Sequence, residues 1–436
     1  MISYLLAFGL AAAPLAEVRT AEGYDTRLTG QWLAKGYGYV LDIAPDRLTL
    51  YHVADGLCLK DPRGGDDPDG LFVQWQARPG GHVALTPGPE ETLYDFEPIP
   101  GLPAACRSPE AWTPERRFAF VTATLRTHYP SFERVGVDWP KLMKDIRARH
   151  PRLNSDAQLW HALTEVYTAL DEPHSEVSNG VDTVEGGQAA TIIRLGDKVA
   201  VKTWLGAYRD GILNDVLAGK GHHVGNQKIF WGRRGDIGYL SVMTMGGYTV
   251  DGSSDLATLD AILDEALTAF SGTKAVIVDV SNNRGGHDST ARAIASRFAA
   301  EPHLAYTKRP AATPDATPQA FYVRPSQRVR YAGPVYVLTS DITVSAGETF
   351  VLAMKALPNV TTIGTATRGA FSDQIPKPLD NGWIFTLSAE VYRDVQGRWP
   401  EGQGITPDQR LDIYGDPDPL KSHAQAVLRL IDQLSQ

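Results

Sequence analysis

The most constraining feature of this 436-residue sequence is an alternation of apolar strands and amphipathic helices from about residue 235 onward. The run AVIVDV at 275–280 is apolar without interruption, as in a parallel strand that helices cover on both faces. Further strands are predicted at VYVLTS, VTTIG and WIFTLSAEVY, and helices at 255–270, 289–299, 345–357 and 417–434. Short right-handed crossovers between such elements build a layered α/β domain.

Two other units precede this domain. Residues 23–105 contain short alternating or aromatic-rich runs between Gly, Pro and Asp clusters, which is typical of a small β domain. Residues 110–178 are predicted to be helical, with Thr113 and Asp138 as N-caps. We therefore expect a small N-terminal β domain, a helical cap segment, and an α/β core over 179–436 that ends in a helix.

Composition and motifs exclude several classes of function. The formal net charge is −9 and no long run of Lys or Arg occurs, which argues against binding to a nucleic-acid backbone. The sequence has no HExxH, Cys-x-x-Cys, P-loop or dinucleotide fingerprint. We therefore expect no metal or nucleotide cofactor.

The N-terminus predicts export. Residues 1–16 have the apolar stretch and small residues of a signal peptide that is cut after Ala13 or Ala16, and a buried N-terminal helix is the alternative. The stretch is too short to span a bilayer comfortably, which takes about 20 apolar residues. We expect a periplasmic or secreted protein. There, Cys58 and Cys106 could form a disulfide, although two separate buried thiols fit the sequence equally well.

Two local features could carry acyl-transfer chemistry. Ser345 lies where the strand VYVLTS turns into a helix, so amides of the first helical turn could stabilise an oxyanion. Ser345 and Glu348 also fit a capping box, which the local sequence alone favours. The loop SNNRGG at 281–286 contains Gly285 and Gly286, whose amides could approach a ligand closely, although a plain turn is the alternative.

Three segments, in order and spacing, resemble the signature segments of the C-terminal-processing and tricorn serine peptidases, the family of tail-specific proteases. They read KAVIVDVSNNRGG, VYVLTSDITVSAGETFVLAMKALPNVTTIGTATRG and GRWPEGQGITPD. The resemblance covers roughly residues 110–436. It implies a ClpP/crotonase-like α/β core and an endopeptidase that forms an acyl-enzyme on Ser345 with protein or peptide substrates.

The same resemblance implies the groups around the nucleophile. The oxyanion hole would consist of the Ala346 amide and an amide of Gly285 or Gly286. Thr367 and Gly369 match motif positions that bind substrate. A peptide-binding PDZ unit is not recognisable between 179 and 234, so recognition of substrate C-termini is not expected.

The base differs between branches of the family. The processing proteases use a Lys whose slot here holds Ala370, and the nearby Arg368 stays protonated. The tricorn branch uses a His, and His174 in YTALDEPHSEVS matches its L-x-D-x-H pattern. A His with a near-neutral pKa can take the Ser proton and return it to the leaving amine. His174 is therefore the predicted base, with His287 as the competitor.

The third member of the triad is less determined. Glu401 in PEGQGITPD matches an acid of the family, but the Ser that precedes the His in tricorn-type sites is Pro173 here. Asp171 and Glu176 are substitutes. Two other functions share the motifs: a non-catalytic binding protein for peptides or apolar ligands, like the interphotoreceptor retinoid-binding protein modules, and an esterase or amidase.

Overall fold

The computed structural model describes residues 14–64, 70–108, 110–187, 191, 198–251, 256–415 and 418–436. The predicted signal peptide lies, up to residue 13, outside these residues. Within the described ranges, no helix has both the length and the apolar character needed to cross a membrane.

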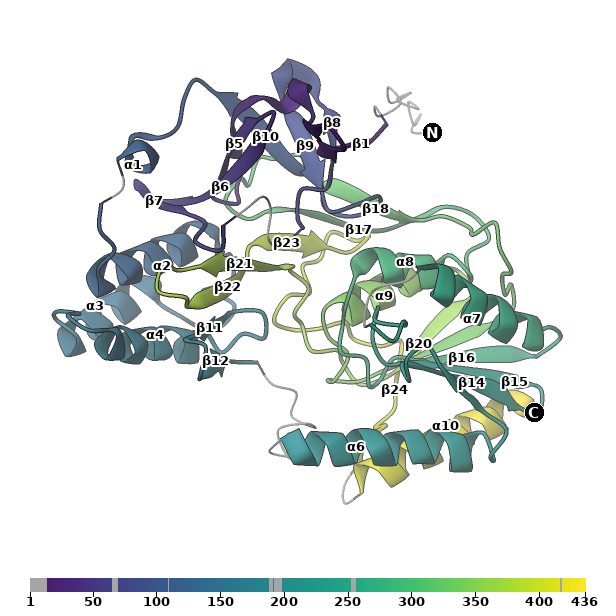
Figure 1. Ribbon diagram of the computed structural model, residues 1–436. Helices are drawn as coiled ribbons and strands as arrows, with labels where there is room; N and C mark the ends of the chain where they lie inside the picture. Colours follow the sequence, from purple (N-terminus) through teal and green to yellow (C-terminus); the bar gives the residue numbers. More distant parts are fainter. Residues whose placement is uncertain are drawn as a thin grey trace, which may run out of the picture.

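A seven-stranded sheet forms the centre of the C-terminal half (Figure 1). Its order is β13 (His222–Val224), β14 (Ile229–Arg234), β15 (Ile237–Val242), β16 (Ala275–Asp279), β19 (Val335–Thr339), β20 (Val360–Gly364) and β24 (Gln409–Arg410). The strands from β15 to β24 pair in parallel, whereas β13, β14 and β15 pair antiparallel. The predicted layered α/β arrangement is present.

Helices cover both faces of this sheet, as Figure 1 shows. Side chains alternate along β16, so Val276 and Val278 pack on one face and Ala275 and Ile277 on the other. The first face is covered by α7 (Leu256–Ala269), α8 (Asp288–Ala295) and α9 (Ala346–Lys355), and the second by α6 (Lys198–Asp210) and α10 (Pro419–Ser435). The prediction that AVIVDV is buried on both faces is confirmed.

The run WIFTLSAEVY, which the sequence presents as one β segment, divides between two sheets. β22 (Ile384–Ser388) joins a four-stranded sheet of order β12 (Thr183–Glu185), β11 (Glu176–Ser178), β22, β21 (Gln374–Pro378). β23 (Glu390–Arg393) joins β18 (Gln319–Val323) and β17 (His303–Pro310). The switch occurs at Ala389, where the Ser372 hydroxyl oxygen accepts from the amides of Ala389 and Glu390. These two amides therefore bond to a side chain.

The N-terminal strands form an eight-stranded antiparallel sheet. Its order is β1 (Ala16–Glu17), β8 (Gln74–Ala77), β9 (Val83–Thr86), β10 (Tyr94–Ile99), β4 (Gly30–Ala34), β5 (Tyr39–Ala44), β6 (Arg47–Ala54) and β7 (Leu57–Lys60). A disulfide joins Cys58 of β7 to Cys106 of α1 (Ala104–Arg107). The structure thus resolves the alternative left open by the sequence in favour of the bonded pair.

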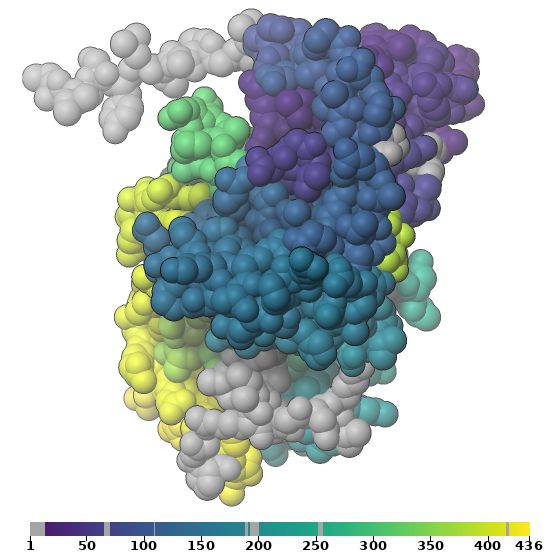
Figure 2. All heavy atoms as spheres, turned by 90° about the vertical axis from the view of Figure 1, so that its left-hand side faces the viewer, coloured from purple at the N-terminus to yellow at the C-terminus, as the bar shows by residue number. Residues whose placement is uncertain are grey.

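The helical segment consists of α2 (Pro114–His128), α3 (Trp139–Arg149) and α4 (Asp156–Leu170). The predicted N-caps are confirmed, because the side chains of Thr113 and Asp138 accept amides of the first turns of α2 and α3. Figure 2 shows this blue layer on one face of the molecule, beneath the N-terminal strands.

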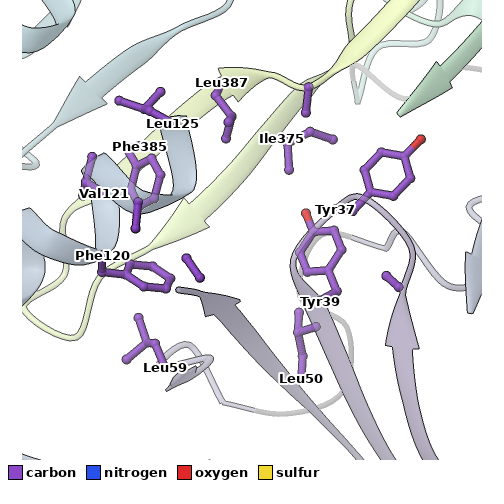
Figure 3. Packing of buried hydrophobic residues seen from close by; sticks show 14 of the residues in the cluster. Tyr37, Tyr39, Leu50, Leu59, Phe120, Val121, Leu125, Ile375, Phe385 and Leu387 are labelled. Carbon is purple, nitrogen blue, oxygen red and sulfur yellow. The ribbon is translucent and has the colours of Figure 1, made fainter. Parts of the chain in front are cut away.

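One hydrophobic cluster is continuous from the N-terminal sheet through α2 and α4 to β21 and β22. Figure 3 shows part of this cluster, with Phe120 of α2 and Phe385 of β22 on one side and Tyr39 and Leu50 of the N-terminal sheet on the other. The strands at 374–388, which the sequence assigns to the α/β core, therefore pack with the helical segment. This packing brings the end of α4 close to the chain that follows β20.

Candidate active site

Ser345 immediately precedes α9 and has an unusual backbone. An ordinary N-cap is extended, whereas Ser345 has φ 59° and ψ −127°, a region that residues with a Cβ rarely occupy. Such strain costs about 1–3 kcal/mol and persists where neighbours enforce it. Here the Ser345 amide donates to Ala370 O at 3.0 Å and to Glu348 Oε2 at 3.2 Å. Glu348 thus makes its half of the predicted capping box, but Ser345 is more constrained than a simple cap.

The glycine loop after β16 lies directly against Ser345. A Cβ placed on Gly285 would lie 2.7 Å from Ser345 Cβ and 3.2 Å from its Oγ, so no side chain fits there. The loop is held by Asn283, whose Nδ2 donates to Val242 O and whose Oδ1 accepts the Gly285 amide at 2.9 Å. The structure therefore brings together two segments that the sequence separates by about sixty residues.

Two amides beside Ser345 have no acceptor among the described residues: those of Gly286 and Ala346. Gly286 is exposed, and the bonds that join this loop to Met245 use the Gly285 carbonyl and the His287 amide. Ala346 is the first residue of α9, where an amide precedes the first intrahelical bond. Of the two glycines that the sequence offers, Gly286 therefore has the available donor.

Glu348 organises the segment that follows β20. Its carboxylate is fully buried and accepts from Thr367 Oγ1 at 2.6 Å, Gly369 N at 2.7 Å and Ala370 N at 2.8 Å. Burial raises the pKa of Glu348 to about 7, and these donors oppose the rise. The sequence predicts that Thr367 and Gly369 contact substrate. In the structure, the Thr367 hydroxyl and the Gly369 amide donate to Glu348.

His174 lies beyond the end of α4, after Asp171, which has a left-handed backbone with φ 43°. Its Nδ1 is 2.6 Å from Ser372 O, and its amide donates to Glu172 Oε1. A carbonyl can only accept, so Nδ1 carries a proton, and in the neutral tautomer Nε2 carries the lone pair. Ser372 is two residues from Ala370, so the chain that holds Ser345 also holds His174.

Glu401 contacts the same segment at Phe371, the residue between Ala370 and Ser372. Its carboxylate is buried and accepts the Phe371 amide at 3.2 Å. Burial, followed by repulsion from Glu172 and Glu348, raises its pKa well above the usual range. The imidazole of His174 bonds to the Ser372 carbonyl, so the orienting contact that the sequence assigns to Glu401 is made by a backbone group.

The other candidate residues have separate surroundings. Asp171 accepts the Gly187 amide, and Glu176 lies in β11, where burial raises its pKa. His287 is exposed and begins α8. Ser372 and Glu172 are not marked in the sequence, because a carbonyl contact and an acid two residues before a His have no distinctive sequence pattern.

Comparison with known proteins agrees with these features. Residues 236–411 match the family model of peptidase family S41. The chain is similar to a candidate peptidase from Parabacteroides merdae ATCC 43184, with 25% identity, a TM-score of 0.58, and coverage of 75% of this chain and 98% of that one. It is also similar to mature CPAF complexed with lactacystin, with 14% identity, a TM-score of 0.54, and coverage of 74% and 98%. These findings support a serine peptidase with an α/β peptidase fold, which acts on protein or peptide substrates.

Proposed function

We infer that this serine peptidase hydrolyses peptide bonds through an acyl-enzyme formed on Ser345. The Ser345 Oγ attacks the substrate carbonyl while His174 Nε2 takes its proton and then gives it to the leaving amine. Water, deprotonated by His174, releases the acyl group. The observation that carries this proposal is the strained Ser345 backbone at a helix N-terminus, in contact with the glycine loop.

The oxyanion would be held by the amides of Gly286 and Ala346. Both lack acceptors among the described residues, and a helix N-terminus adds a favourable dipole. Thr367 and Gly369 would support the oxyanion site indirectly, by holding Glu348. Direct contact of these two residues with substrate, through atoms that do not bond to Glu348, stays a prediction. Glu401 stays the proposed third member, acting beside Phe371 and not on the imidazole Nδ1.

Several finer features are also proposed. Ala370 brings only a methyl group to the lysine slot, and its carbonyl accepts the Ser345 amide, which favours a His base over a Ser-Lys dyad. The resemblance favours an endopeptidase with a ClpP/crotonase-like core, and the layer of α2, α3 and α4 is proposed to be its cap. The boundaries at 23–105, 110–178 and 179–436 remain proposals.

Fluorophosphonate labelling tests the nucleophile. We expect the probe to label the wild-type protein at Ser345 and to leave the Ser345→Ala variant unlabelled. The control is Ser271→Ala, which changes an exposed serine just after α7 and should be labelled like the wild-type protein. Peptide hydrolysis should follow the same order. Labelling with hydrolysis of esters alone would indicate the esterase alternative, and no labelling would indicate a binding protein.

Export is proposed from the signal-like N-terminus and from the Cys58–Cys106 disulfide, which suits an oxidising compartment. Ala16 belongs to β1 and pairs with Trp75 of β8. Cleavage after Ala13 would therefore preserve β1, whereas cleavage after Ala16 would remove part of β1. N-terminal sequencing of the mature protein checks this. An unprocessed N-terminus in the cytosolic fraction would contradict export.

A further inference from the structure

Arg284 lies in the glycine loop, between Asn283 and the residue that touches Ser345. Its amide donates to Met243 O at 3.0 Å, and both of its neighbours are fixed by the Asn283 side chain. The base of this long side chain is therefore as rigidly placed as the loop itself. It begins one residue from the contact between Gly285 and Ser345.

The guanidinium group of Arg284 has buried donors without acceptors. Nε and Nη2 have no hydrogen-bond partner, and Nδ2 of Asn282 in the same loop has none, among the residues that the structure describes. An unpaired buried donor costs about 1–3 kcal/mol, and more for a charged group. No acidic side chain bonds to Arg284, so its charge is not balanced by the described part of the chain.

A second cation lies near Arg284. Arg368 is two residues before Ala370, and its Nε donates to the backbone carbonyl of Asp341 at 3.1 Å. Burial and the positive charge of Arg368 both lower the pKa of the Arg284 guanidinium, although both groups remain protonated at neutral pH. Burial also lowers the pKa of Arg368, but the carboxylates of Glu348, Asp341 and Glu185 oppose this and partly balance its charge. An anion from outside the chain would therefore chiefly stabilise Arg284, whose Nε and Nη2 lack partners among the described residues.

We propose that Arg284, assisted by Arg368, forms a carboxylate-binding subsite of the substrate cleft beside Ser345. The proposal rests on the peptidase function inferred above. Guanidinium groups match the planar geometry of carboxylates and bond them through two parallel donors. The carboxylate is either the C-terminus of the peptide or an Asp or Glu side chain within it.

The position of the subsite limits its distance from the cleaved bond. An extended peptide advances about 3.3 Å per residue. Because Arg284 is adjacent to the loop that contacts Ser345, the carboxylate would lie within about three residues of the scissile bond. The subsite would therefore favour release of short C-terminal fragments or cleavage next to acidic residues.

Matched peptides distinguish the two sources. Two pairs of peptides are made from a sequence that the wild-type protein cleaves. The first pair ends three residues from the cleaved bond in either a free carboxylate or an amide. The second pair has either Asp or Asn at an internal position. We expect the carboxylate member of one pair to have a kcat/KM about 10-fold or more higher. Preference within the first pair indicates a terminal carboxylate, and preference within the second indicates an acidic side chain. Equal rates in both pairs overturn the proposal.

Arginine variants test the residues. Arg284→Met should abolish the preference, so that the carboxylate and uncharged members of a pair are cleaved at equal rates. Arg368→Met should reduce the preference, and Arg284→Lys should keep part of it. Arg233→Met is the matched control, because Arg233 is exposed and bonds to Ala269 O at the end of α7. A preference that survives Arg284→Met contradicts the assignment.

A binding measurement separates this inference from the proposed function. The affinity of Ser345→Ala for the acid and amide peptides is measured by fluorescence anisotropy, which requires no turnover. We expect tighter binding of the carboxylate member, and loss of that difference when Arg284→Met is added. If the wild-type protein cleaves nothing but this difference holds, the peptidase function fails and the subsite stands. If cleavage occurs without the difference, the subsite fails.

Discussion

Among the described residues, a set of Ser, His and acid side chains lies where α10 covers the central sheet, and another set includes Ser345, which precedes α9 on the other face of the sheet. One set is Ser281, Asp279 and His423, and it resembles a catalytic triad in composition. The other is Ser345, His174 and Glu401. The first set is sealed between the sheet and α10, with each member at most 2% exposed. Residue types alone therefore do not identify the active site.

The two sets differ in what their hydrogen bonds leave available. His423 Nε2 bonds to Asp279 at 2.7 Å, and Ser281 donates its hydroxyl to the same acid and not to the imidazole. Around Ser345, by contrast, the backbone is strained and two amides have no acceptor among the described residues. A satisfied network fixes α10 to the sheet, whereas unsatisfied donors beside a strained serine suit a reacting substrate.

The serine pair should show the largest contrast. We expect Ser345→Ala to lower kcat/KM by about 10³-fold or more without reducing stability. Ser281→Ala should leave activity within about threefold but lower the free energy of unfolding by about 1 kcal/mol, because it removes bonds to Asp279 and Tyr414. Peptidase assays and urea titrations measure both. Full activity in Ser345→Ala would place the nucleophile elsewhere.

The histidine pair sharpens the same comparison. His174→Ala should lower kcat/KM by about 10²- to 10⁴-fold, as expected for loss of a general base. His423→Ala should leave the chemistry intact but destabilise the fold by about 3 kcal/mol, because Asp279 would be buried without its partner. His423→Gln, which still donates, should restore part of this stability. His287→Ala serves as the control, and a loss equal to that of His174→Ala would make it the base.

The contrast also explains how far the sequence alone could lead. An uninterrupted apolar run predicts β16 and its two covered faces, and side-chain caps predict where α2 and α3 begin. These features depend on neighbouring residues. The strand switch at Ala389 and the shared core of the N-terminal units depend on partners far along the chain, and the sequence shows neither.

The same limit applies to the candidate site. Ser345 and the glycines are marked by ordered motifs, and their contact is observed. The sequence does not distinguish Gly286 from Gly285, because the bond from the Gly285 amide to Asn283 Oδ1 appears only in the folded loop. The Ser372 carbonyl that orients His174 is a backbone group, which no residue type can reveal.

Asp279 and Glu348, the buried acid that bonds to the Ser345 amide, should respond to pH in opposite directions. Burial alone would raise the pKa of Asp279, but His423, Tyr239 and Ser281 outweigh it and lower the pKa, so its stabilisation is present above pH 4 and is lost as the pH falls. The pKa of Glu348 is raised from 4.5 to about 7, so its stabilisation is present below pH 4.5 and is lost as the pH rises through 7.

Urea titrations at pH 5 and pH 8 measure the Glu348 effect. Glu348→Gln should reduce the wild-type loss of stability between these pH values by about 3 kcal/mol at most. The absolute stability of the variant is not the readout, because its side-chain amide would stand where three backbone N–H groups donate to the carboxylate. Glu265→Gln, at an exposed position of α7, should keep the wild-type slope. An unchanged slope in Glu348→Gln would show that Glu348 ionises normally.

The smallest expected effect concerns Glu401. Burial and Glu172 raise the pKa of Glu401 well above the usual range, which favours the neutral carboxyl group that a glutamine resembles. Glu401→Gln should therefore lower kcat/KM by only about 10-fold. An ionised triad acid behaves differently, since its replacement by an amide lowers kcat by about 10⁴-fold. If Glu401→Gln lowered kcat by about 10⁴-fold and also shifted the pH profile of activity, Glu401 would be ionised in the active protein and would be the acid that holds His174.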